Sequence, residues 1–206
     1  MNKMKPRVLL AGLLLAAWGV AAAAPISGSP TGLASPELTI TFDEHILTPG
    51  DVLTNQYADL GLTFTPNLFY SCQEGFDNIT GNTATSFGCF GSGGDRVFSF
   101  SLKFSVDQTA AAFAMVSNDS VWTFEALDDG VVVESFNANA FFDTNGPNNF
   151  FGFTGIMFDE IRITSPDEDS MILDNVQLSS VPEPGALALL GIAFAGFAAS
   201  RRRRAT

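Results

Sequence analysis

Basic residues are scarce in the middle of this chain. The 206 residues include 10 Lys and Arg against 22 Asp and Glu, a formal net charge of −12. Seven of the ten cations lie at the two ends; between Pro25 and Ser180 only Arg96, Lys103 and Arg162 oppose 21 carboxylates, a net charge of −18. Such a body repels phosphate backbones, so no nucleic-acid partner is expected. The hydrophobic fraction of 46% excludes a disordered chain.

Histidine is represented once, by His45, and a CxxC pair is absent. No Gly-x-Ser-x-Gly sequence marks a nucleophile, so a Ser-His-Asp triad is not indicated and we expect His45 to be an ordinary loop residue. The missing CxxC argues against a cysteine metal site or a redox motif.

The N-terminal segment has the layout of a secretory signal peptide. Residues 1–7 are basic, residues 8–20 are apolar, and small residues precede Pro25. We expect a signal peptide over residues 1–24, cut after Ala23 or Ala22, which directs the chain to the secretion machinery. An uncleaved N-terminal anchor is the alternative.

The C-terminal segment combines a Pro-Glu-Pro motif, an apolar run and a basic cluster. These parts are Pro182, Glu183 and Pro184, residues 185–199, and Arg201, Arg202, Arg203 and Arg204. As a helix the apolar run spans about 22 Å, which is shorter than the ~30 Å hydrocarbon core, so the flanking arginines would have to snorkel. The positive-inside rule keeps them cytoplasmic and leaves the acidic body outside. Composition alone also allows a simple tail anchor.

Together these parts resemble the PEP-CTERM sorting signal of Gram-negative bacteria over residues 181–206. The resemblance implies a transient inner-membrane anchor and recognition by an exosortase, a membrane transpeptidase that cuts near the Pro-Glu-Pro motif and releases or transfers the protein at the cell surface. Hosts of this system make exopolysaccharide, which is therefore an implied partner. The same tail is also named an ice-binding-protein C-terminal domain, which concerns the tail and implies no ice binding here.

Alternating side chains predict an all-β body. In residues 97–104 the apolar residues Phe98, Phe100, Leu102 and Phe104 share one face, as expected of a half-buried strand. Nine short strands are expected: residues 38–42, 60–64, 97–104, 110–116, 121–127, 131–133, 150–153, 159–164 and 171–178. Since no window shows a sustained helical period, we predict an antiparallel β-sandwich of residues 37–180, jelly-roll-like, after a linker of residues 25–36. An N-terminal signal helix and a C-terminal transmembrane helix would flank it.

Most of the 20 phenylalanines are expected in the core of this domain. Sequence does not separate buried rings from a sugar-binding platform in the pairs Phe141-Phe142 and Phe150-Phe151. Cys72 and Cys89, the only cysteines, lie in a Gly/Asn/Ser-rich stretch of an exported chain. We therefore predict a disulfide between them, with two free thiols as the alternative.

A calcium site is a further prediction. By strand parity Asp174 shares a face with Ile172 and Val176, and burying a bare carboxylate is costly. Calcium would offset that cost with oxygen ligands from Asp174, Asp43 or Glu44. The arrangement resembles jelly-roll carbohydrate-binding modules, in which acids of the first and last strands hold a structural calcium. The alternative is that Asp174 caps a bulge or turns to solvent.

The sequence thus favours a noncatalytic exported protein of the cell surface or extracellular matrix, acting as a glycan-binding or structural module of an exopolysaccharide layer or biofilm. An extracellular glycan hydrolase is one alternative, with carboxylates such as Asp43 and Asp174 as acid and base. An acidic adhesin or matrix scaffold is another.

Overall fold

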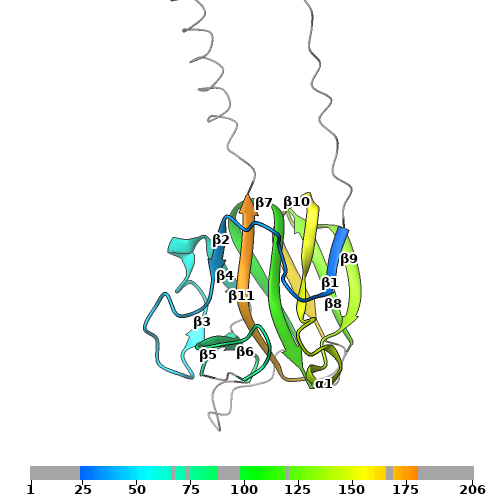
Figure 1. Ribbon diagram of the computed structural model, residues 1–206. Coiled ribbons are helices and arrows are strands. Elements are labelled where there is room, and N and C mark those ends of the chain that lie inside the picture. The colour runs from blue at the N-terminus through cyan, green and yellow to red at the C-terminus, as the bar shows by residue number, and fades with distance from the viewer. Residues whose placement is uncertain are drawn as a thin grey trace, which may run out of the picture.

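The computed structural model describes residues 24–65, 68–72, 75–87, 98–118, 121–165 and 169–180. Nearly all regular structure in these residues is antiparallel β (Figure 1). The strands are β1 (Ala24–Ser29), β2 (Leu38–Ile40), β3 (Val52–Leu53), β4 (Leu62–Thr65), β5 (Leu68–Ser71), β6 (Thr83–Thr85), β7 (Ser99–Ser117), β8 (Val121–Asp128), β9 (Val131–Asn139), β10 (Phe150–Thr164) and β11 (Met171–Ser180). Two short helical elements, η1 (Ala58–Leu60) and α1 (Phe142–Asn145), complete the fold.

These strands form one hydrogen-bonded sheet. Its order is β3-β5-β6-β11-β7-β10-β8-β9, while β1 pairs with β10, β2 with β11 and β4 with β7. The predicted antiparallel all-β class is confirmed. The predicted jelly-roll-like sandwich is not, because all 11 strands belong to a single sheet rather than to two separate ones.

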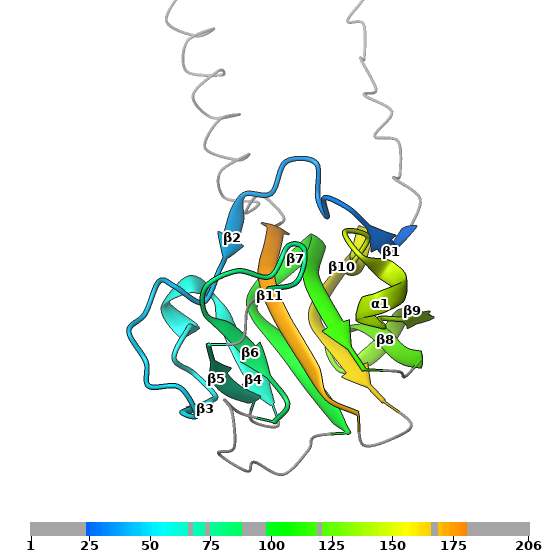
Figure 2. The same ribbon diagram turned by 60° about the horizontal axis from the view of Figure 1, so that its bottom comes forward.

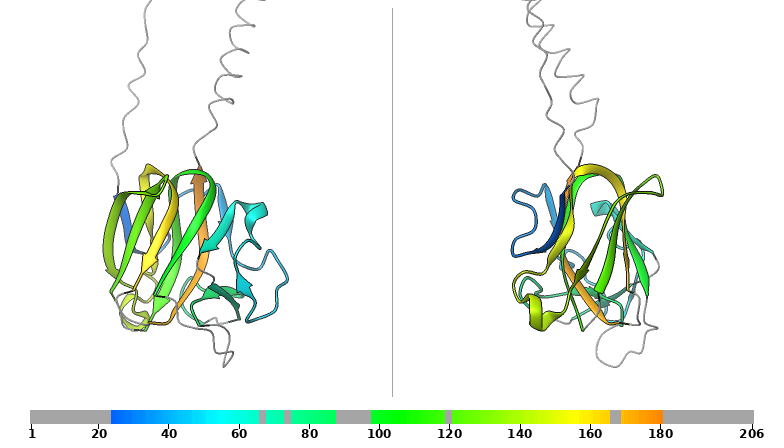
Figure 3. Two further views of the ribbon diagram at one scale, coloured as in Figure 1. Left: turned by 180° about the vertical axis from the view of Figure 1, so that it is seen from behind. Right: turned by 90° about the vertical axis from the view of Figure 1, so that its right-hand side faces the viewer.

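Two long strands, β7 and β10, extend through both halves of the sheet. β7 pairs with β4 through Ser101 to Phe104, and with β11 through Gln108 to Ser117. β10 follows β7 along both parts, with register shifts between Thr154 and Glu160. The sheet arches at this point, so that its two halves face each other (Figure 3). Residues 97–104 and 110–116, predicted as separate strands, are therefore largely one bent strand, and the same holds for residues 150–153 and 159–164.

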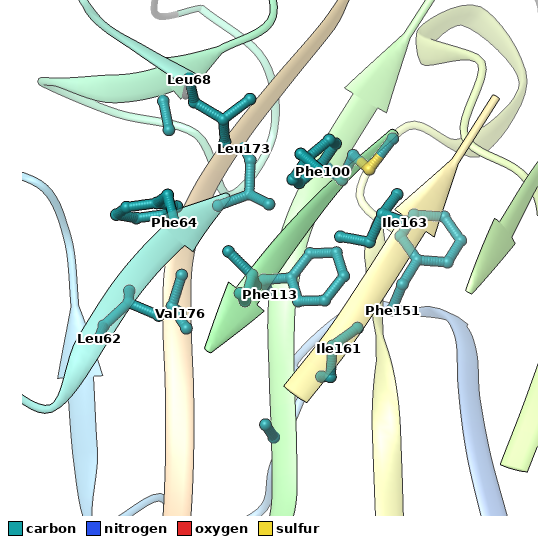
Figure 4. Close-up of a cluster of buried hydrophobic side chains, with 14 of the residues drawn as sticks. Leu62, Phe64, Leu68, Phe100, Phe113, Phe151, Ile161, Ile163, Leu173 and Val176 are labelled. Carbon is teal, nitrogen blue, oxygen red and sulfur yellow. The ribbon is translucent and has the colours of Figure 1, made fainter. Parts of the chain in front are cut away.

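The main core lies between the two halves (Figure 4). Phe100, Leu102 and Phe104 are buried there and Lys103 is exposed, as the alternation predicts. Ser101, on the same face as Lys103, is also buried, and its hydroxyl donates a hydrogen bond to Glu160. Among the apolar residues Phe98 is the exception at 47% exposure, because it precedes the first residue of β7. Trp122, Phe124 and Ala126 of β8 are likewise buried.

A second, smaller apolar cluster covers the outer face of β7, β10 and β11. It contains Ile79, Ala112, Ala114, Val116, Phe150 and Ile172. Ile26 and Leu33 of the N-terminal segment pack against it. Residues 25–36, expected as a linker, therefore include β1 and a segment that crosses the outer face of the sheet (Figure 1).

The first and last residues of the described domain lie at the same end of the strands, called here the terminal end. Ala24 is opposite Thr154, Thr154 is opposite Ala110, and Ala110 is opposite Ser179. α1 lies at the opposite end of the strands, called here the distal end (Figure 1). The predicted signal helix and transmembrane helix fall in residues 1–23 and 181–206, outside the described residues. No helix within the described ranges has the length and apolar character to cross a membrane.

Candidate functional site

Asp174 shares a face with Ile172, as predicted, but not with Val176. Asn175 has a positive φ of 51°, and the pairing of β11 with β7 shifts register between Asp174 and Gln177. This bulge reverses the alternation: Ile172 belongs to the outer cluster, whereas Val176 belongs to the main core. Asp174 therefore lies on the outer face, fully buried.

The partners of Asp174 are protein N–H groups. Its Oδ2 accepts a hydrogen bond from the backbone N–H of Thr80 at 3.0 Å, and its Oδ1 accepts one from the backbone N–H of Asn175 at 2.6 Å. The Asn175 side chain donates to the carbonyl of Asn78 at 2.8 Å. The two residues of the bulge thus hold the segment Asn78 to Thr80 against the outer face of the sheet.

Burial raises the pKa of Asp174 to about 7, and the nearby carboxylates of Asp43 and Glu44 add to the increase. The two backbone N–H groups lower it, but by less than burial raises it. The carboxyl therefore titrates near neutral pH, unlike an exposed aspartate.

Asp43 and Glu44 are held by other donors. Asp43 Oδ1 accepts from the side-chain amide of Asn82 at 2.5 Å, and Gly81 lies so close that an added Cβ would be 2.5 Å from Asp43 Oδ2. Glu44 accepts from the backbone and hydroxyl of Thr41 at 2.8 and 3.0 Å.

Among the described residues, no three His, Cys, Asp or Glu side chains converge closely enough to hold a metal ion. The carboxylates of Asp43 and Glu44 are near enough to Asp174 to raise its pKa. The hydrogen bonds that the Asp174 carboxylate accepts, however, come from the backbone N–H groups of Thr80 and Asn175. Calcium is not shown by this geometry.

His45 is paired with a carboxylate rather than with a serine or cysteine nucleophile. Its Nε2 lies 3.0 Å from Asp59 Oδ1, and its ring packs 5.0 Å from that of Tyr57. Cys72 follows β5, while Cys89 lies outside the described residues, so the disulfide between them stays a prediction. Pro182, Glu183, Pro184 and the four arginines of the tail also lie beyond the described part.

A hollow lined by aromatic rings opens at the distal end. Two adjoining concavities of about 270 and 290 Å³ share Phe76, Val116 and Phe142 in their lining. The Phe76 and Phe142 rings meet edge to face with centroids 5.7 Å apart, and Phe142 is 37% exposed. Phe87 lines the first concavity. Figure 2 turns this end of the molecule towards the viewer. We call these surfaces together the aromatic hollow.

Polar groups stand beside the rings of the aromatic hollow. Ser117, Asn118 and Ser170 line the first concavity, and Asp77 lines the second. The Ser117 Oγ is buried and has no hydrogen-bond partner in the described structure. The hollow therefore combines apolar ring faces with polar side chains.

The structure divides the two phenylalanine pairs that sequence left open. Phe150 and Phe151 are core residues, one in each apolar cluster, whereas Phe142 faces solvent in the aromatic hollow. Sequence reasoning did not single out Phe76 and Phe87. The available signal was that each is an isolated aromatic residue in a stretch rich in glycine, asparagine and serine.

The C-terminal part of this chain matches a family model. The model of the PEP-CTERM protein-sorting motif matches residues 180–204, and no curated protein matches the chain. The match begins at the last residue of β11 and covers the Pro-Glu-Pro motif, the apolar run and the four arginines.

Proposed function

The chain carries a PEP-CTERM sorting signal at its C-terminal end, and on that premise we propose that its β domain is a noncatalytic module that binds glycan in the extracellular layer. The sorting signal implies an exported protein, anchored in the membrane by its C-terminal segment and processed by an exosortase. The aromatic hollow is the observation that carries the glycan-binding part of the proposal.

The lining of the hollow suits a sugar ring. A pyranose presents an apolar C–H face that packs on an aromatic ring and a rim of hydroxyls that needs polar partners. Phe76, Phe87 and Phe142 supply rings, while Asn118 and Ser170 supply hydrogen-bonding groups. Pockets that combine apolar side chains with a few polar groups are typical of small-ligand sites.

The position of the hollow suits a displayed module. Ala24 and Ser180 lie at the terminal end, next to the two segments that enter the membrane during export and sorting. The aromatic hollow lies at the opposite end of the strands, beside α1, where it faces away from that attachment.

The buried state of Asp174 supports a noncatalytic role over the hydrolase alternative. Glycoside hydrolysis needs two carboxyl groups that face the same bond of the substrate. Asp174 is covered by the segment that ends at Thr80, and Asp43 is bonded to Asn82. Of the described residues that line the aromatic hollow, Asp77 is the one with a carboxylate.

Affinity electrophoresis against the host's own exopolysaccharide tests the proposal. We expect the polysaccharide to retard the wild-type protein, and Phe142→Ala and Phe76→Ala to restore its mobility because each removes a ring of the hollow. Phe98→Ala is the control, since Phe98 is exposed but lies outside this lining. Unretarded wild-type protein, or equal retardation of Phe142→Ala, would contradict glycan binding at the hollow.

A further inference from the structure

Glu37 fastens the last residue of the domain. Its Oε2 accepts hydrogen bonds from the backbone N–H of Ser180 at 3.0 Å and from the Ser180 hydroxyl at 2.9 Å. Its own N–H donates to the carbonyl of Leu178 at 2.9 Å. The bonds from Ser180 lower the pKa of Glu37. The end of β11 is therefore held to the sheet up to the residue where the sorting motif begins.

The sorting motif follows Ser180 with almost no spacer. Pro182 is two residues beyond Ser180 and Pro184 is four. A fully extended chain spans at most about 3.6 Å per residue, so Pro184 lies within about 14 Å of Ser180. An enzyme that cuts at this motif must bind residues on both sides of the bond. With so short a tether, it meets the terminal end of the folded domain when it does so.

A groove opens at this end of the domain, next to Ser180. It has a volume of about 270 Å³, and its lining includes Leu38, Val106, Gln108 and Leu178 as well as Glu37 and Ser180. Val106 is 51% exposed, and Leu38 is also exposed. Gln108 is 3% exposed, and its Oε1 lacks a hydrogen-bond partner among the described residues. The groove thus combines exposed apolar side chains with an unused buried acceptor.

We infer that this groove, walled by Leu38, Val106 and Leu178, is the surface on which the exosortase docks when it processes the chain's own sorting signal. The enzyme then recognises a composite substrate: the motif itself and the folded surface from which it emerges. The role of Glu37 is to hold Ser180 at the groove, so that the motif leaves the domain from a defined point.

Charge favours a protein partner over the membrane surface at this site. Asp107 follows Val106 in the chain, and the pKa of Asp128 is raised by burial and by the nearby carboxylates of Asp129, Asp107 and Asp159. The terminal end is therefore acidic and repels anionic lipid headgroups. This argument concerns the sorting step and is independent of glycan binding at the aromatic hollow.

Pulse-chase of the full-length chain in its native host, read as the ratio of precursor to processed protein, tests the inference. Val106→Asp places a charge in the groove; Val121→Asp is the matched control, because Val121 is 52% exposed and lies at the start of β8, away from the groove. We expect Val106→Asp to slow processing about thirtyfold, the effect of losing an interface hot spot, and Val121→Asp to leave it unchanged.

A spacer version separates docking from any general defect. With eight Gly and Ser residues inserted between Ser180 and Val181, the enzyme reaches the motif without touching the domain, so Val106→Asp should then be processed as fast as its parent. Processing of Val106→Asp at the wild-type rate without the spacer would overturn the inference, as would equal slowing with and without it. Binding of the processed protein to anionic vesicles that Val106→Asp abolishes would also overturn it, in favour of a membrane contact.

Discussion

Thr80 and Asp174, 94 residues apart in the chain, are joined by a 3.0 Å hydrogen bond from the backbone N–H to the carboxylate. The bond links the segment that follows Phe76 to the last strand of the sheet. Because Asp174 is fully buried and its pKa is raised to about 7, this link has a pH dependence that can be measured.

Asp174→Asn should change how stability depends on pH. The pKa of Asp174 in the folded state, about 7, exceeds the ordinary value of 3.8, so folding favours the protonated form and the carboxyl costs stability as pH rises between these values. Asparagine removes that cost. Relative to wild type, the variant should therefore gain on the order of 3 kcal/mol of unfolding free energy between pH 5 and pH 8.

Urea unfolding at the two pH values measures this difference. Asp143→Asn, on the exposed α1, is the control and should follow wild type at both. An Asp174→Asn variant that loses stability relative to wild type as pH rises would show that the buried carboxylate is stabilising in its charged form.

Added calcium tests whether the carboxylate of Asp174 is a metal ligand. Since Thr80 and Asn175 already donate hydrogen bonds to Asp174, we expect calcium to leave the melting temperature of the protein unchanged. Thermal melts with calcium and with a chelator make the comparison. An increase with calcium that Asp174→Asn abolishes would instead establish the metal site that the sequence suggests.

Gly32→Ala should destabilise the protein through the segment that crosses the sheet. Gly32 has a φ of +65°, and an added Cβ would lie 2.4 Å from Gln177 Oε1 and 2.7 Å from Phe150 Cδ1. Gln177 Oε1 also accepts the Leu33 N–H at 2.7 Å, so it cannot move away without loss. We expect a cost of about 2–3 kcal/mol, from strain and overpacking together.

Gly130→Ala is the matched control for Gly32→Ala. Gly130 has a similar φ of +79°, but nothing lies within 4 Å of its added Cβ, so only the backbone strain of about 1 kcal/mol applies. Denaturant unfolding compares the two variants. Equal costs would show that the N-terminal segment does not pack on Gln177 and Phe150 as described.

Local patterns predicted the longer strands of the sheet, but they missed β1 and the short strands β3, β5 and β6, and they did not predict the faces and hollows that depend on distant contacts. The alternation over residues 97–104 reports burial directly, so Phe100, Leu102 and Phe104 were placed correctly. β1 was missed because Pro25 and Gly28 disfavour strand and the apolar positions do not alternate over its length. The bulge at Asn175 depends on the segment around Asn78, which local parity cannot include.

The aromatic hollow was beyond prediction for a related reason. Phe76 lies in a loop and Phe142 begins α1, 66 positions later, so their closeness depends on the whole sheet. Nothing in the spacing of either residue shows that it lines a hollow. The groove at Ser180 likewise depends on a contact with Glu37 across 143 residues.

The predicted disulfide has its own test. If Cys72 and Cys89 are bonded, reduction should lower the unfolding free energy by roughly 3 kcal/mol, the entropy of closing a loop of this length. Unfolding with and without reductant measures the change. The Cys72→Ser variant should be insensitive to reductant, and a wild-type protein equally insensitive would mean two free thiols.

Intact mass spectrometry of the protein recovered from its native host tests the export and sorting account most directly. That account predicts a chain that begins near Ala24 and ends near Pro184, because the signal peptide is removed and the exosortase cuts at the Pro-Glu-Pro motif. A mass that extends through the four arginines to Thr206 would contradict exosortase processing and identify the tail as a simple membrane anchor.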